Sequence, residues 1–217
     1  MEERKHIVIL AAGDFPTHPV PLRALREADF VVCCDSACMG LPNDNSFDNY
    51  VAIGDGDSLS PAAKRALGDR WLQVDEQDYN DLHKAIDWAT THYPVSTSHF
   101  TILGATGRRE DHTLGNISYL VTFAEEHPGA RIEMLTDHGR LTAMTGSRTY
   151  ACFAGQQVSL FSLDPDKPIS STGLRWPLDG FLARRWWQAT LNEALGTEFS
   201  LRTEGWLIVF QTYEPKG

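Results

Sequence analysis

Cysteine, long apolar runs and zinc-binding spacings are scarce or missing in this sequence of 217 residues. No apolar run approaches the roughly 18 residues that a membrane-spanning helix requires. No C-x-x-C pair is matched by a second C-x-x-C or an H-x3-H, so a zinc site is not supported. We expect the few cysteines to be small buried residues in a reducing compartment. They are Cys33, Cys34, Cys38 and Cys152.

Positive charge is also in short supply. The chain has 19 Lys and Arg against 29 Asp and Glu, a formal net charge of −10. Such an acidic chain is not expected to bind nucleic acid, and it would need a divalent cation to bind a polyphosphate. The first apolar stretch is too short for a secretory leader, so we expect a cytoplasmic protein with no membrane partner.

Short apolar runs alternate with helical patterns through the first two-thirds of the chain. The runs at 7–12, 30–34, 51–53, 100–103 and 131–135 are apolar on both faces, which is typical of buried parallel strands. Helix signals lie between them: Ser60 and Pro61 ahead of a segment that ends at Gly68, an apolar stripe from Leu82 to Ala89, and a pattern after residue 112. The sequence therefore predicts a mostly parallel α/β sheet domain.

The pattern changes near residue 148. Strand-like segments at 157–163, 198–203 and 205–210 are separated by turn-rich stretches, without a convincing long helix. We therefore expect an α/β domain over 1–146 and a smaller all-β domain, a sandwich, over 147–217.

Carboxylates follow several of the predicted strands. Asp14, Asp35, Asp55 and Asp137 each come within two residues of a strand end, where α/β sheets bind their ligands. Asp55 and Asp57 form a D-x-D pair in a glycine-bearing loop, and two such carboxylates repel unless a cation neutralises them. Mg²⁺ suits this pair together with substrate phosphates, although D-x-D alone is a common chance occurrence.

Two further segments carry polar groups suited to phosphate chemistry. Asn80 is a natural N-cap for a helix that begins with Asp81, and Gln77 lies just before it. A loop with Gly104, Gly107 and two arginines follows one strand and precedes a helix, so its backbone N–H groups and arginines can bind an anion. This loop matches neither a P-loop nor a dinucleotide fingerprint.

The chain resembles the thiamine pyrophosphokinase family. The resemblance runs through ADFVVCCDSACMGL, GDGDSL, DEQDYNDLHKAIDWA, LGATGRREDHTLGNI, TDHGRLTAM and STGLRWPL, over most of residues 6–210. It implies an α/β catalytic domain, a β-sandwich domain, a homodimer, and Mg²⁺-dependent transfer of pyrophosphate from ATP to the hydroxyethyl group of thiamine. The products are thiamine diphosphate and AMP.

The resemblance also implies roles for particular residues. Metal and catalytic positions fall on Asp55, Asp57 and Asp81, with Asp111 as a further catalytic residue that positions either the hydroxyl or Arg109. The implied nucleotide or phosphate positions are Asp35, Gln77, Gly104, Gly107 and Arg109. The implied thiamine positions are Trp176 and Asn192.

Four positions depart from the family pattern. Ser36 and Ala37 replace two glycines, Asn80 replaces a threonine, and Leu191 replaces a serine near the expected thiamine pocket. Two alternatives therefore stay open: a pyrophosphokinase that acts on a different alcohol, and a non-catalytic sensor of thiamine or nucleotide. Release of AMP from ATP with a panel of alcohols distinguishes them.

Overall fold

The computed structural model describes residues 4–42 and 47–215, and the chain divides into two compact units. The first contains the chain up to Tyr119 together with Glu126–Asp137, and the second contains Leu120–Glu125 and the chain from His138 onward. The predicted boundary at 146/147 therefore falls inside a strand of the second unit, β7 (Gly139–Ala151).

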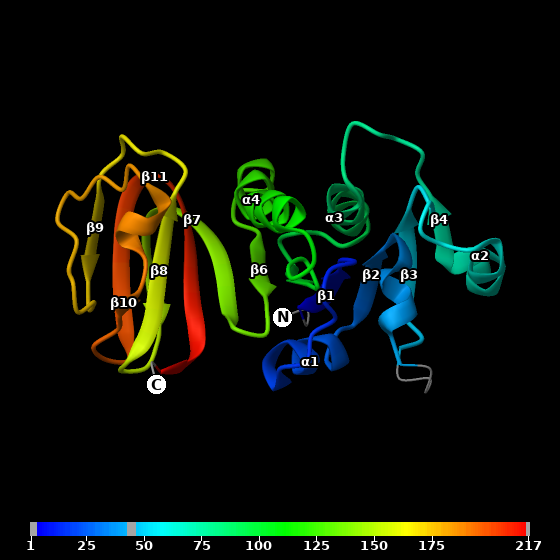
Figure 1. Cartoon of the computed structure of the whole chain (residues 1–217), viewed down its shortest axis with the longest axis horizontal. Helices are drawn as coiled ribbons and strands as arrows, with labels where there is room; N and C mark the ends of the chain where they lie inside the picture. Colours follow the sequence, from blue (N-terminus) through cyan, green and yellow to red (C-terminus); the bar gives the residue numbers. More distant parts are fainter. Residues whose placement is uncertain (1–3, 43–46, 216–217) are drawn as a thin grey trace. The chain divides into compact units, whose positions relative to one another are not determined.

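The first unit is built on a parallel sheet of six strands in the order β6-β5-β1-β2-β3-β4 (Figure 1). All five runs predicted as strands are present. The six strands are β1 (Lys5–Leu10), β2 (Phe30–Cys34), β3 (Tyr50–Gly54), β4 (Trp71–Gln73), β5 (Ser98–Leu103) and β6 (Arg131–Leu135). The apolar side chains on both faces are buried, which confirms a sheet covered on its two sides.

Helices connect these strands where the capping signals predict them. The Ser60 side chain accepts a hydrogen bond from Ala63 N–H at the start of α2 (Pro61–Leu67), and Gly68 ends it at φ 55°. Asn80 caps α3 (Asp81–His92) by accepting from His83 N–H at 2.9 Å. The last α-helix, α4 (Glu110–Glu126), begins before the predicted pattern, and Asp111 lies in its first turn.

Several short elements carry no strong sequence signal. They are helix α1 (Pro19–Arg26), the 3-10 helices η1 (Asp35–Gly40) and η2 (Gly68–Arg70), and strand β4. The N-cap of α1 is a histidine ring, His18, which accepts from Val20 N–H at 3.2 Å. Three residues are too few for β4 to show a period of two.

From β7 onward the second unit is built of strands around one core. Its strands are β7, β8 (Gln156–Ser162), β9 (Ile169–Thr172), β10 (Asn192–Glu193) and β11 (Glu198–Pro215), with one 3-10 turn, η3 (Trp186–Ala189). The two segments predicted at 198–203 and 205–210 are one long strand with an irregularity between Thr203 and Leu207. The first half of β11 pairs with β9 and the second with β8. Side chains from both halves share one core, which includes Phe199 and Val209.

Two further findings concern helix length and the cysteines. Within 4–42 and 47–215, no helix is both long and apolar enough to cross a bilayer. Cys33, Cys34 and Cys38 are buried, as expected, whereas Cys152 is only half-buried. All four are free thiols, and burial raises the pKa of the Cys33 thiol.

A stacked histidine pair on the sheet makes stability depend on pH. His6 and His99 stack with ring centroids 5.2 Å apart, and a His6 ring nitrogen lies 2.9 Å from Thr101 Oγ1. Burial, followed by the nearby His99, lowers the pKa of His6 below its ordinary 6.5. The unfolded chain therefore binds more protons than the folded chain just below pH 6.5, so the free energy of unfolding falls as the pH drops through this window.

We expect His6→Gln, which keeps a hydrogen-bonding group beside Thr101, to flatten this pH dependence. Urea unfolding at pH values from 8 to 5, compared between the two proteins, measures the effect. Parallel curves for parent and variant would contradict the prediction.

Candidate active site

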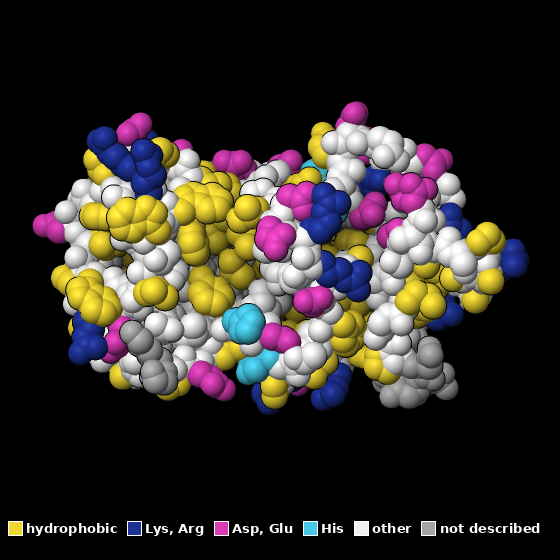
Figure 2. All heavy atoms as spheres, in the orientation of Figure 1, with side chains coloured by type: hydrophobic (Ala, Val, Ile, Leu, Met, Phe, Trp, Pro, Cys, Tyr) yellow, Lys and Arg dark blue, Asp and Glu magenta, His cyan; other side chains and the backbone are white. Residues whose placement is uncertain are grey.

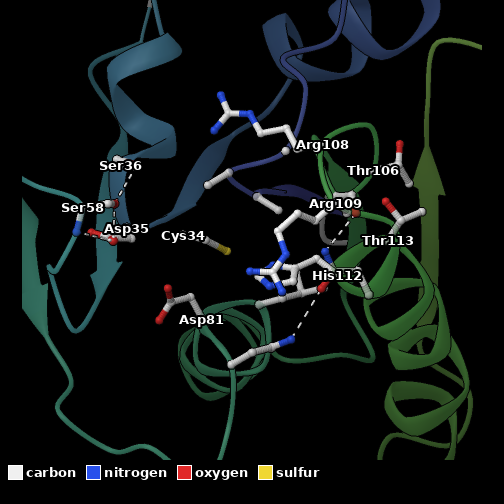
Figure 3. Close-up of a pocket in the computed structure, with 17 residues that line it drawn as sticks. Cys34, Asp35, Ser36, Ser58, Asp81, Thr106, Arg108, Arg109, His112 and Thr113 are labelled. Carbon is white, nitrogen blue, oxygen red and sulfur yellow. Dashed lines mark hydrogen bonds between the residues drawn. The ribbon is translucent and has the colours of Figure 1, made fainter.

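A cavity of about 360 Å³ lies in the first unit, at the carboxyl ends of strands β1, β2 and β5 and the N-terminal turns of α3 and α4. Figure 3 shows Asp35, Ser58 and Asp81 on one side of it and Arg108, Arg109 and His112 on the other. The cavity therefore brings Asp35 and Asp81 together with the arginine-bearing glycine loop.

Three carboxylates at this end of the sheet form a group that could hold a metal ion. They are Asp35, Asp55 and Asp81, each with one oxygen within 4.8 Å of the others. Asp35 and Asp55 directly follow strands β2 and β3, and Asp81 opens helix α3. Residues far apart in the chain are therefore brought together by adjacent parallel strands and the helix that follows them.

Asp35 is the most constrained member of the group. Its backbone has φ 45°, a left-handed conformation that is uncommon for a residue other than glycine. One carboxylate oxygen accepts hydrogen bonds from the hydroxyl and the backbone N–H of Ser58. Its other oxygen is buried and has no hydrogen-bond partner among the described residues. An unpaired buried carboxylate oxygen is costly, so the residues present fit a bound cation.

The charges of the group are unevenly stabilised. Burial raises the pKa of Asp81, with a further rise from Asp55 and Asp35 that the Lys84 ammonium opposes. By contrast, the backbone N–H of Asp57 lowers the pKa of Asp55 by donating to its carboxylate at 3.0 Å. The group as a whole favours the uptake of positive charge.

Asp57 lies outside this group. Its side chain is exposed, because the chain turns at Gly56, which has φ 77°. Gln77, also exposed, reaches the Asp55 carboxylate with its amide at 3.5 Å. The structure therefore groups Asp35, and not Asp57, with Asp55 and Asp81. Asp57 contacts Asp55 through its backbone N–H.

The glycine loop is fixed to the loop that follows β1. Gly13 N–H donates to Gly104 C=O at 2.7 Å, and Asp14 N–H donates to Thr106 C=O at 2.9 Å. Gly104 and Gly107 have φ 62° and 108°, which other residues rarely adopt. This pairing holds the loop open toward the cavity, at the start of α4.

Arg109 and Asp111 form a two-point ion pair. Arg109 Nε donates to Asp111 Oδ1 at 3.1 Å and Nη2 donates to Oδ2 at 2.5 Å. Arg109 lines the cavity, and both side chains are more than half exposed. The hydrogen bond from Arg109 lowers the pKa of Asp111, and the two-point contact is suited to orienting the guanidinium.

Some cavity residues were not predicted individually. Ser58 holds Asp35, and Asn116 fixes the glycine loop by donating to Ala105 C=O at 2.9 Å. Arg108 and His112 also line the cavity. Ser58 completes the GDGDS motif and could have been found there, whereas Asn116 is an ordinary helix residue with no local signal.

The predicted thiamine residues lie in the second unit and are hydrogen-bonded to each other. Asn192 accepts from Trp176 N–H at 3.1 Å and donates to Trp176 C=O at 2.7 Å. Leu191, with φ 59°, is exposed beside Asn192. Hydrophobic side chains gather on one face of this unit over β8 and β10 (Figure 2). The exposed large hydrophobic residues of this part of the chain are Trp176, Trp186, Trp187, Leu191 and Leu195.

Family models match both parts of the chain. Residues 22–134 match the thiamin pyrophosphokinase catalytic domain, and residues 139–210 match the thiamin pyrophosphokinase substrate-binding domain. Among curated proteins, thiamine pyrophosphokinase 1 of Oryza sativa subsp. japonica is 32% identical over 142 residues, and thiamine pyrophosphokinase 3 of the same species is 33% identical. Each alignment covers 59% of this chain and 52% of the relative, so the chain spans about half the length of the curated relatives it matches.

Solved structures share the fold over nearly the whole chain. A thiamin pyrophosphokinase from Candida albicans superposes with a TM-score of 0.82 at 16% identity, covering 97% of this chain and 90% of that one. A thiamine pyrophosphokinase from Bacillus subtilis superposes with a TM-score of 0.76 at 21% identity, covering 97% and 100%. These likenesses confirm the predicted fold class, an α/β unit followed by a β unit.

Proposed function

The chain belongs to the thiamin pyrophosphokinase family, and from this premise we propose that it transfers pyrophosphate from ATP to the hydroxyl group of thiamine. The observation that carries the proposal is the cavity of the first unit, where Asp35 and Asp81 face Arg109 across the ends of parallel strands. Phosphoryl-type transfer depends mainly on positioning and charge neutralisation, and this arrangement supplies both signs of charge.

The acidic side of the cavity would hold Mg²⁺. Asp35, Asp55 and Asp81 are its proposed ligands on geometry, because they are the grouped carboxylates. Asp57 is kept as a further ligand on the strength of the family resemblance, and Gln77 would support Asp55 and the nucleotide. When bound, Mg²⁺ neutralises the phosphate charge and the charge that develops on the leaving group.

The glycine loop and Arg109 would bind the phosphates. Backbone N–H groups of a loop at a helix N-terminus favour an anion, and Gly104 and Gly107 allow the left-handed turns of this loop. Arg109, oriented by Asp111, would contact phosphate oxygens with its guanidinium. This assignment makes Asp111 a positioning residue.

The reaction consists of one displacement. The thiamine hydroxyl oxygen forms a bond to the β-phosphorus of ATP, the bond from that phosphorus to the α,β-bridging oxygen breaks, AMP leaves, and the hydroxyl proton is released. Trp176 would supply an aromatic wall for the cationic thiazolium ring, and Asn192 fixes the backbone that carries it. We further propose, on family resemblance, a cytoplasmic homodimer.

The decisive experiment incubates the purified protein with ATP, Mg²⁺ and thiamine and follows AMP and thiamine diphosphate together. Equal amounts of the two products, abolished by EDTA, are expected. AMP formation with another alcohol but not with thiamine would identify a different pyrophosphokinase. Thermal stabilisation by thiamine without any AMP would identify a sensor.

A further inference from the structure

Helix α3 carries a lysine buried against the acidic group. The Lys84 side chain is 5% exposed, and lysine is almost never buried to this degree unless its charge is paired. Asp81 lies at i−3 on the same face of the helix, and its carboxylate is 3.5 Å from the Lys84 ammonium. The lysine is therefore directed toward the group proposed to hold the cation.

Lys84 also fastens the segment that carries Gln77. Its ammonium donates to Val74 C=O at 3.3 Å, while Val74 N–H donates to Gly54 C=O at 2.8 Å at the end of β3. The segment from residue 75 to 80 is thus tied to helix α3 at its first end by Lys84 and at its last end by the Asn80 cap. One side chain therefore links β3, this segment and a carboxylate of the acidic group.

The Lys84 ammonium changes the net charge of the acidic group. Asp35, Asp55 and Asp81 carry three negative charges when ionised, and the Lys84 ammonium compensates one of them. A bare divalent cation entering the group is repelled by that ammonium. A cation that arrives with a polyphosphate brings negative charge that the same ammonium attracts.

We propose that Lys84 is a positioning residue and internal counter-charge, which weakens binding of a bare divalent cation and makes the acidic group select a cation–polyphosphate complex. The inference rests on the acidic group being the metal site of the proposed function. It goes beyond that function because it makes one buried side chain, Lys84, responsible for the preference of the site for metal-bound nucleotide over free metal.

The test measures Mn²⁺ binding to the purified protein without thiamine, by calorimetry. We expect Lys84→Met to bind bare Mn²⁺ on the order of tenfold more tightly than the parent, because a like charge beside the site is removed. With adenosine 5′-(α,β-methylene)triphosphate present, the gain in Mn²⁺ affinity caused by the nucleotide should be on the order of tenfold smaller in the variant. Lys84→Arg should restore the parent behaviour.

Lys5→Met is the matched control, because it removes a lysine of the same unit that opens strand β1, at the end opposite the cavity, and whose ammonium pairs with Asp29 at 3.2 Å. It should leave Mn²⁺ affinity within about twofold of the parent. Unchanged Mn²⁺ binding in Lys84→Met, even with a lower melting temperature, would overturn the proposal and leave Lys84 a purely structural residue.

If Lys84→Met does not fold, the same Mn²⁺ affinities are measured with Lys84→Gln, which removes the charge and keeps a buried hydrogen-bond donor. Failure of the parent protein to make thiamine diphosphate would reject the proposed function, whereas the Mn²⁺ comparison does not depend on turnover.

Discussion

Asp81→Asn is expected to lower kcat for thiamine diphosphate formation about a thousandfold, while leaving the protein folded. The amide keeps the size of the carboxylate but cannot supply its charge to a cation, and electrostatic groups of this kind are worth about two to three orders of magnitude each. Because burial raises the pKa of Asp81, the charged carboxylate is disfavoured in the folded state. The free energy of unfolding at pH 7 should therefore stay close to the parent value, because relief of this burial cost opposes the loss of the ion pair with Lys84.

Asp78→Asn is the matched control, since Asp78 is an exposed carboxylate of the same segment and lies outside the grouped carboxylates. Its kcat should stay within about twofold of the parent, as for an exposed, screened charge. Asp57→Asn is expected to reduce turnover by orders of magnitude if the family assignment holds. A parent-like rate for Asp57→Asn would remove that residue from the metal site, whereas a parent-like rate for Asp81→Asn would reject the site itself.

Gly13→Ala is expected to destabilise the first unit by about 3 kcal/mol or more, because overpacking against a rigid backbone is expensive. A Cβ at Gly13 would lie 2.4 Å from the carbonyl oxygens of both Gly104 and Thr106, so the glycine loop must move. Since that loop is the proposed phosphate site, KM for ATP should rise together with the loss of stability. Urea unfolding and steady-state kinetics measure the two effects.

Gly115→Ala provides the contrast within the same unit. Gly115 lies inside helix α4, and an added Cβ there meets no atom within 4 Å. Alanine favours the helix over glycine, so stability should increase by about 0.5–1 kcal/mol with no change in KM for ATP. Equal stabilities of the Gly13 and Gly115 variants would show that the loop after β1 is not closely packed against the glycine loop.

Local signals account for most of the first unit. Both-face apolar runs identify β1, β2, β3, β5 and β6 because parallel strands are buried on both sides. Ser60 and Asn80 identify the starts of α2 and α3 because their side chains satisfy free backbone N–H groups. These features depend on a few neighbouring residues, which is why the sequence alone can predict them.

The missing elements depend on long-range pairing. Strand β7 forms through its ladder with β11, about sixty residues later in the chain, so no local pattern around residue 146 predicts a strand there. Gly205 in the run before Trp206 is typical of a turn, yet the chain continues through it as one strand, β11. In both cases the partner strand, and not the local sequence, decides the conformation.

In the candidate site, too, some features follow from local sequence and others depend on the folded backbone. Strand ends predict that Asp35 and Asp55 lie near each other, since adjacent parallel strands end at one edge. The choice between Asp35 and Asp57 as the third grouped carboxylate depends on the backbone turn at Gly56 and the left-handed conformation of Asp35. Neither conformation can be read from residue types.

The hydrogen bonds from Gly13 and Asp14 to Gly104 and Thr106 join segments about ninety residues apart in the chain. During synthesis, the ribosome must therefore release the chain beyond Gly107 before this loop can reach its final shape. Until then the early aspartates are present without the turn that faces them, so the proposed nucleotide site cannot be complete in the newly made N-terminal half. Pairing of β1 with β5 is therefore needed before the proposed site can be complete.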